Sequence, residues 1–324
     1  MLRAFLKTVP IPTAGLALGV IALGKLLGTY IPAIEPVCAL LALALILLVT
    51  ARIVMCPRAV AADLAQPVQA AVFGTFFMTY MQLATYLPAA SLDAARVLWV
   101  AAVIGHFALM VWFTVQRVRN LRLEDVYATW FVCYVGIIVA SVTSPAVQLQ
   151  GLGRAIFWFG FVAYLALLVI VTVRHARLQL AAPAAPTFCI YAAPMSLSIA
   201  GYLSAFTTPS APFVLVLELA AQALLLVVLF RLPRLLRGGF FPSFAAMTFP
   251  FVITATALTK ALALFRSSGF AVPAVADVLL AAEVILAAVM TTYVFVRFMG
   301  MFMTKMREIA GAEVPAAGAK GAAA

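Results

Sequence analysis

Residues 38–49 read CALLALALILLV, a run without a single charged side chain, and similar runs recur at 161–173 (FVAYLALLVIVTV) and 223–230 (ALLLVVLF). A water-soluble domain needs roughly a quarter of its residues charged. Here only 10% of the 324 residues are charged, 66% are hydrophobic, and the mean hydropathy is +1.16. The missing polar surface indicates that lipid surrounds the chain. We therefore predict an all-α integral membrane protein.

The positions of the apolar runs predict how many times the chain crosses the membrane. A membrane-spanning helix needs about 20 mostly apolar residues. Ten stretches meet this requirement: 11–28, 35–55, 67–87, 92–115, 125–143, 152–173, 187–206, 211–230, 241–264 and 273–299. Their connections are short, so residues 1–310 are expected to form one ten-helix transmembrane domain. Residues 311–324 have low complexity, and we expect them to be a disordered C-terminal tail.

Arginines mark an internal period. Each even-numbered span ends at an arginine, and successive arginines are 65, 57, 57 and 66 residues apart: Arg52, Arg117, Arg174, Arg231 and Arg297. A repeated spacing of this kind is typical of stacked supersecondary units. Since each unit holds one odd and one even span, the period predicts five tandem helical hairpins.

The odd and even spans differ in character. Even spans are uniformly aliphatic, whereas odd spans carry small and hydroxyl residues, which favour helix contacts or water-lined cavities over lipid. We interpret this as an inner pore ring of odd helices inside an outer ring of even ones. The simpler alternative is that these residues only allow close packing. The pore-lining candidates are Gly15, Gly19, Thr75, Thr129, Gly136, Ser198, Gly201 and Thr256.

Two prolines fall inside odd spans, Pro194 in the seventh and Pro250 in the ninth. A proline within a helix removes a backbone donor and frees a carbonyl group, and membrane proteins tolerate this where protein or a wet cavity surrounds the helix. We therefore expect kinked inner helices that narrow a central path.

The net charge of +11 comes from basic residues that stand singly between apolar runs. Their scatter does not form a nucleic-acid groove. Sixteen of the 21 lie on one predicted side, which places both termini in the cytoplasm and the protein in the inner (plasma) membrane as a multi-pass protein. Lys260 and Arg266 lie toward the other side, where an external basic rim would favour anions.

Motifs for catalysis and for cofactors are missing from the sequence. The four cysteines have no metal-ligand spacing, so neither a metal nor a cofactor is predicted, and the protein is not expected to be an enzyme. His106, Glu218 and Glu283 are ionisable residues on outer spans. They have two interpretations, interhelical hydrogen bonds or a proton relay.

Four stretches in order along the chain carry a family resemblance: 7–24 (KTVPIPTAGLALGVIALG), 126–145 (VYATWFVCYVGIIVASVTSP), 186–204 (PTFCIYAAPMSLSIAGYLS) and 245–257 (AAMTFPFVITATA). They resemble the tellurite-resistance/dicarboxylate transporter family, which includes bacterial TehA proteins and the slow anion channels of plant guard cells. The resemblance implies five helical hairpins, a homotrimer, and a phenylalanine in the ninth helix that plugs the pore. Phe249 matches that phenylalanine.

The fifth span departs from the family pattern. Relatives often carry a proline early in this helix, where this chain has Ala128 and Thr129, so we expect a straighter fifth helix.

Together these observations predict transport of small inorganic or organic anions through a central pore gated by Phe249. The alternative within the same family is a proton-coupled C4-dicarboxylate carrier of the malate type, or a sulfite or tellurite exporter.

Overall fold

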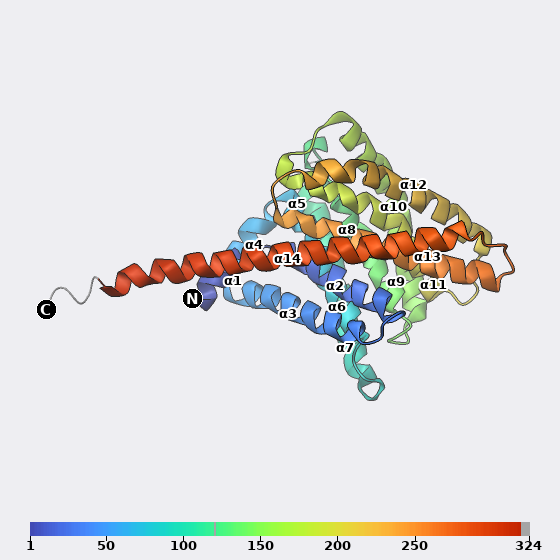
Figure 1. The fold of residues 1–324 in the computed structure, drawn as a ribbon, viewed down its shortest axis with the longest axis horizontal. Coiled ribbons are helices and arrows are strands. Elements are labelled where there is room, and N and C mark those ends of the chain that lie inside the picture. The colour runs from blue at the N-terminus through green and yellow to red at the C-terminus, as the bar shows by residue number, and fades with distance from the viewer. Residues whose placement is uncertain (120, 319–324) are drawn as a thin grey trace.

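The computed structural model describes residues 1–119 and 121–318, with side chains as far as Gly311, and this part of the chain is helical with no strand. Seven of its helices are long and apolar enough to cross a membrane. An eighth span results if α1 (Leu2–Thr8) and α2 (Thr13–Gly28), bent by 81°, count as one. The helices gather into one bundle, and α14 runs along its full length (Figure 1). The prediction of a multi-pass helical membrane protein is thus confirmed.

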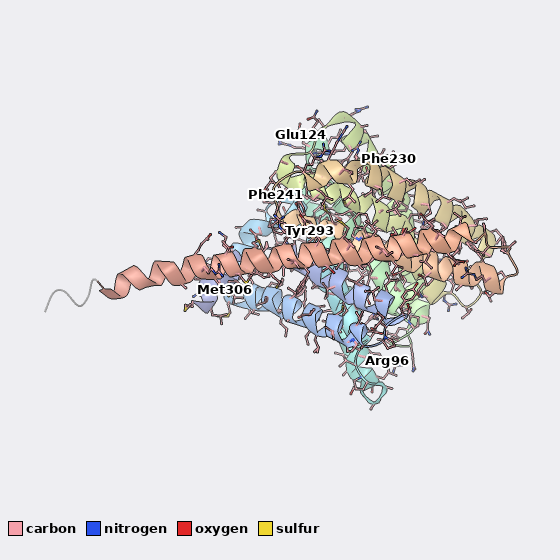
Figure 2. The ribbon with its side chains drawn as sticks, in the orientation of Figure 1. Arg96, Glu124, Phe230, Phe241, Tyr293 and Met306 are labelled. Carbon is pink, nitrogen blue, oxygen red and sulfur yellow. The ribbon has the colours of Figure 1, made fainter. Side chains whose placement is uncertain are left out.

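Five long helices face outward: α3 (Ile34–Met55), α7 (Leu92–Phe113), α10 (Gln150–Arg177), α12 (Ala211–Leu236) and α14 (Val275–Gly318). In each, only 28–39% of the most apolar window is buried inside the protein. Phe230 on α12, for example, is 83% exposed (Figure 2). Large apolar side chains left exposed in this way are stable only against lipid.

Before each long helix the chain forms an interior segment, and four of these five segments are interrupted. The five segments are α2; α5 (Pro67–Val72) with α6 (Gly74–Ala84); α8 (Trp130–Tyr134) with the 3-10 turn η4 (Gly136–Ile138) and α9 (Val139–Thr143); the 3-10 helix η5 (Ala182–Ala192) with α11 (Ala193–Ala205); and the 3-10 helix η6 (Pro242–Met247) with α13 (Phe249–Ser267). The two longest, 182–205 and 242–267, are 89% and 72% buried in their apolar windows. The interrupted segments therefore form the interior of the bundle.

Interruptions explain why fewer long helices occur than the ten predicted spans. The stretches 67–87 and 125–143 are each divided into helices shorter than a membrane crossing. In the second stretch the α-helix gives way to 3-10 geometry at Gly136. The fifth span, which we expected to be straighter for lack of an early proline, is thus divided into α8, η4 and α9.

Pro194 and Pro250 also differ from the expectation. Neither kinks a continuous α-helix: each lies in the first turn of a helix, α11 or α13, directly after a 3-10 stretch. Proline is favoured at this position because the first-turn N–H groups have no partner within the helix. The prolines thus begin the second half of each segment.

Contacts between the interior segments follow a closed order. The helix α2 contacts α6, α6 contacts α8 and α9, α9 contacts α11, α11 contacts α13, and α13 returns to α2. The long helices pack outside them, such as α3 against α2 and α7 against α6. The core of the protein therefore lies among segments far apart in the sequence.

The five repeated arginines each contact the chain near the beginning of an interior segment. Arg52 pairs with Asp63 at 2.6 Å, Arg117 donates to the Ala65 carbonyl group, Arg174 lies 4.8 Å from the Tyr127 ring, Arg231 4.2 Å from Phe188, and Arg297 5.1 Å from Phe240. The arginine period thus corresponds to a repeated contact between the end of a long helix and a neighbouring connection.

The last helix continues well past the predicted span 273–299. Its Phe302 packs edge-on against Phe5 of α1, with ring centres 5.9 Å apart, and the helix then projects beyond the bundle (Figure 1). The stretch 311–324, expected to be disordered, thus begins inside α14. Its residues 319–324 lie outside the described part of the chain, where the expectation stays a prediction.

Candidate functional site

A cavity of about 340 Å³ lies at the centre of the bundle. All five interior segments contribute to its wall, over residues 12–18, 66–78, 127–136, 183–197 and 241–250. Since these stretches are the beginnings of the segments, the cavity occupies the half of the bundle in which the segments start. Phe241, one of its residues, lies in the left half of the bundle (Figure 2), the side on which Figure 1 marks both chain ends.

The part of the cavity wall farthest along the five segments is mostly apolar. Its residues include Leu18, Met78, Val135, Leu197 and Phe249, and we call this part of the wall the floor. Phe249 is only 7% exposed. Beyond it, the next residues of α13 are buried, among them Phe251 and Val252. An ion that reached this level would lose its water contacts without gaining polar ones.

The backbone next to Phe249 is held by α2. Thr248 interrupts the helix with φ −103° and ψ −83°, and its hydroxyl donates to the Ala245 carbonyl oxygen at 2.7 Å. A Cβ atom on Gly19 would lie 2.3 Å from the Thr248 hydroxyl oxygen and 3.0 Å from the Phe249 nitrogen. Glycine is therefore required there, because any side chain would displace the turn that presents Phe249.

The residues predicted from sequence fall into two groups. Gly15, Thr75, Gly136 and Phe249 are in the cavity wall. Gly19, Thr129, Ser198, Gly201 and Thr256 are not. A Cβ atom on Gly201 would lie 2.4 Å from Ile138, so this glycine allows close packing of α11 on η4. The packing alternative considered above therefore holds for Gly19 and Gly201.

Hydroxyl groups account for most of the mispredicted positions. Ser198 donates to the Pro194 carbonyl oxygen and Thr256 to that of Val252, each at 2.8 Å within its own helix. Even Thr75, which does reach the cavity, donates to Val72 at 2.8 Å. A hydroxyl group that bonds back to its own helix needs no water-filled space. Hydroxyl content therefore marks buried helices rather than cavity walls.

Sequence reasoning missed the apolar floor of the cavity and several polar residues of its upper wall. Leu18, Met78, Val135 and Leu197 carry no signal in a chain that is 66% hydrophobic. The polar residues are Gln66, Gln69, Tyr127, Thr187 and Ser243. Gln69 could have been recognised from the sequence as a candidate for the cavity wall, because it is an amide just after Pro67 at the start of a predicted span.

The charged side chains of the described residues lie outside the cavity wall. None of the described lining residues is acidic or basic. Lys260, half-buried in α13, lies near enough to Lys25 of α2 for the two ammonium groups to repel one another. Arg266 forms an exposed ion pair with Asp277 at 2.5 Å, which offsets its charge. Of the predicted external rim, Lys260 is thus the residue whose charge is not offset by a salt bridge within the described chain.

His106 and the buried glutamates form hydrogen bonds between helices. The Nε2 atom of His106 lies 2.8 Å from the Cys133 carbonyl oxygen, linking α7 to α8. Gln222 on α12 links Glu218 to Glu283 of α14. The described residues include no group of three or more potential metal ligands from His, Cys, Asp or Glu. The contacts of His106, Glu218 and Glu283 therefore support their interpretation as interhelical hydrogen-bonding groups.

Long apolar helices around buried, interrupted segments with a central cavity define a multi-pass membrane protein of the transport type. The sequence model of the voltage-dependent anion channel family matches residues 8–299, and the chain belongs to this family. Its members are channels and transporters of anions rather than enzymes. A search of curated proteins finds no match.

Proposed function

We propose that the protein carries small inorganic or organic anions along a path through the central cavity, between the five interior segments. In this arrangement every interior segment and the long helix after it make one hairpin, giving ten spans in five hairpins. The closed order of contacts among the interior segments supports the arrangement, because it leaves one axis that all five surround. As in the family resemblance, three copies would assemble, each with its own path.

We further propose that Phe249 is the gate of this path. The observation that supports the proposal is that Phe249 is in the wall of the cavity lined by all five interior segments, while Phe251 and Val252, next on α13, are buried outside that wall. Apolar constrictions can block ions by excluding water as well as by filling space. A closed gate of this kind leaves the half of the bundle beyond Phe249 dry until the ring moves.

Selectivity for anions would arise outside the uncharged cavity. Basic residues concentrate on the predicted cytoplasmic side, and Lys260 adds charge beyond the gate. A positive potential at both ends raises the local concentration of anions and falls with ionic strength. Neutral walls then hold the anion weakly, which suits rapid passage.

The gate is tested by the change Phe249→Ala. Removing the ring should raise anion conductance in a planar bilayer by roughly tenfold or more, since each 1.4 kcal/mol taken from a barrier is about a factor of ten. The reversal potential under an anion gradient should stay as in the wild type, because the basic residues are unchanged.

A matched control is available two residues away. Phe251 is fully buried on the same helix and lies outside the cavity wall. Its change to alanine should cost about 3–5 kcal/mol of stability and leave the conductance of the folded protein low. Equal conductance in folded Phe249→Ala and wild-type protein would rule out the gate. Saturable uptake with substrate-dependent pH change would instead favour the dicarboxylate carrier.

A further inference from the structure

A second polar site lies apart from the cavity, between the outer helices α12 and α14. Gln222 donates from its Nε2 atom to one carboxyl oxygen of Glu218 and one of Glu283, each at 2.8 Å. Glu218 is 6% exposed and Glu283 3%. One amide group therefore bridges two carboxyl groups that come from different spans.

The two carboxyl groups are incompletely satisfied. The Oε2 atom of each is buried and has no hydrogen-bond partner among the described residues. The side chain of Thr254, on the adjacent helix α13, faces Glu283, but its hydroxyl donates to the Phe251 carbonyl oxygen at 2.8 Å. An ionised carboxylate with a bare oxygen in such surroundings is strongly disfavoured.

No cation compensates the pair within the described residues. Glu283 acts electrostatically on Glu218, and the nearest other charges on α12, α13 and α14 lie at least six residues along, roughly 9 Å of helix. These are Arg231 and Arg234 of α12, Lys260 and Arg266 of α13, and Asp277 and Arg297 of α14. The helix α11 carries the Tyr202 phenol but no carboxylate and no basic residue, and Lys25 of α2 interacts with Glu35 and Lys260.

The position of the two glutamates well inside their helices increases the free-energy cost of ionising both. Glu218 is seven residues after the start of α12 and Glu283 eight after the start of α14, so both lie roughly 10–12 Å along their helices. Two carboxylates that share a site do not both ionise readily. A proton held by one of them would supply the missing donor to a bare oxygen or to water.

We propose that Glu218 and Glu283 form a proton-binding site within the membrane, in which the carboxyl groups retain at least one proton while Gln222 bridges them. The site touches α13 at Thr254, five residues after Phe249, and so lies against the helix that presents the cavity floor. Loss of the proton would set two negative charges against each other between α12 and α14.

Carbodiimide labelling tests the site without any measurement of transport. A protonated carboxyl group adds across one C=N bond of dicyclohexylcarbodiimide, its proton passing to nitrogen, and the adduct rearranges to a stable N-acylurea. We expect mass spectrometry of the full chain in detergent to find the label on Glu218 or Glu283. Above the pH at which the site loses its proton, the extent of labelling should fall by about tenfold for each further pH unit. The exposed Glu124 and Glu308 serve as internal controls.

A second readout uses the double variant E218Q/E283Q, whose amides keep the shape and cannot ionise. A proton bound in the folded state but lost from the unfolded chain makes stability fall as pH rises. The melting temperature of the wild-type protein should therefore fall more steeply toward alkaline pH than that of the double variant. Absence of label at both glutamates in acid, or parallel pH profiles of the two proteins, would overturn the proposal. So would stabilisation by sodium or potassium ions that the double variant lacks, since that indicates a bound metal cation.

Discussion

Gly19 shows how a residue without a side chain can control a distant one. It lies on α2, yet its missing Cβ atom leaves the space occupied by Thr248, directly before Phe249. The Thr248 Cβ atom and the Phe249 nitrogen, which side-chain rotation cannot move, lie 2.5 and 3.0 Å from the position of that Cβ. Gly19 was expected to line the pore, whereas it lies outside the cavity wall and packs against the residue before Phe249.

Replacing Gly19 with alanine is therefore expected to disturb both stability and the gate. The added methyl group would meet atoms at 2.3 and 3.0 Å, and overpacking of this kind costs about 1–3 kcal/mol. Thermal unfolding of the purified protein measures the loss, and bilayer conductance should change with it. The control is Gly151→Ala on α10, where no atom lies within 4 Å of the new Cβ and alanine should be neutral or slightly stabilising. If the two variants melt alike, the close approach of α2 to Thr248 has no energetic weight.

At the scale of elements, the ends of the long helices are fixed by their arginines. Arg174 is the most enclosed example: it is 3% exposed, donates to the Leu178 carbonyl oxygen at 3.1 Å, and lies over the Tyr127 ring. A planar guanidinium group can do both at once, which a lysine ammonium group cannot. The end of α10 is thereby attached to the chain that leads into α8.

We expect Arg174→Lys to destabilise the protein although the charge is kept. The lost stacking and the charged hydrogen bond together are worth about 1–3 kcal/mol. Arg177→Lys, at an exposed position one turn later on the same helix, should leave the unfolding temperature unchanged. Full rescue by lysine at 174 would mean that only charge matters at this helix end.

The elements also separate what sequence can predict from what it cannot. Apolar runs located the long helices α3, α7, α10 and α12 within a few residues, because a lipid-facing helix must be apolar along its length. The interruption at Gly136 had no comparable signal, whereas Pro250 marked the interruption before Phe249 without showing that a 3-10 stretch would precede it. Both interruptions depend on how closely other segments approach, and only tertiary contacts decide whether a turn becomes α or 3-10.

The residue predicted through the family resemblance lies in the cavity wall, whereas several residues chosen for their chemistry alone lie outside it. Phe249, identified through the resemblance, does lie at the cavity floor, although its function as a gate stays a prediction. Thr129, Ser198 and Thr256 were chosen for their hydroxyl groups and lie elsewhere. The hydroxyl groups of Ser198 and Thr256 bond to their own helices, whereas that of Thr129 is buried without a partner among the described residues. The presence of a hydroxyl group in a membrane helix therefore says little about water.

For the whole molecule, a single floor at Phe249 predicts different access to the two halves of the interior. In a variant without the four native cysteines, cysteine at Thr75 should react with a small charged thiol reagent added from the cytoplasmic side. Cysteine at Ser198, past the cavity on α11, should be protected and should become reactive when Phe249→Ala is added. The order of reactivity also tests orientation. Labelling of Thr75→Cys only from the external side would reverse the predicted topology.

The projecting part of α14 has a consequence for local stability. At about 1.5 Å per residue its 44 residues span about 66 Å, a little over twice a hydrocarbon core of about 30 Å. Phe302 against Phe5 is the last buried anchor, and Met303, Thr304, Met306 and Arg307 beyond it are exposed. An unsupported helix is marginal in water, so backbone amides after residue 303 should exchange with deuterium far faster than those before it. That boundary would mark, along one continuous helix, where support from the bundle ends.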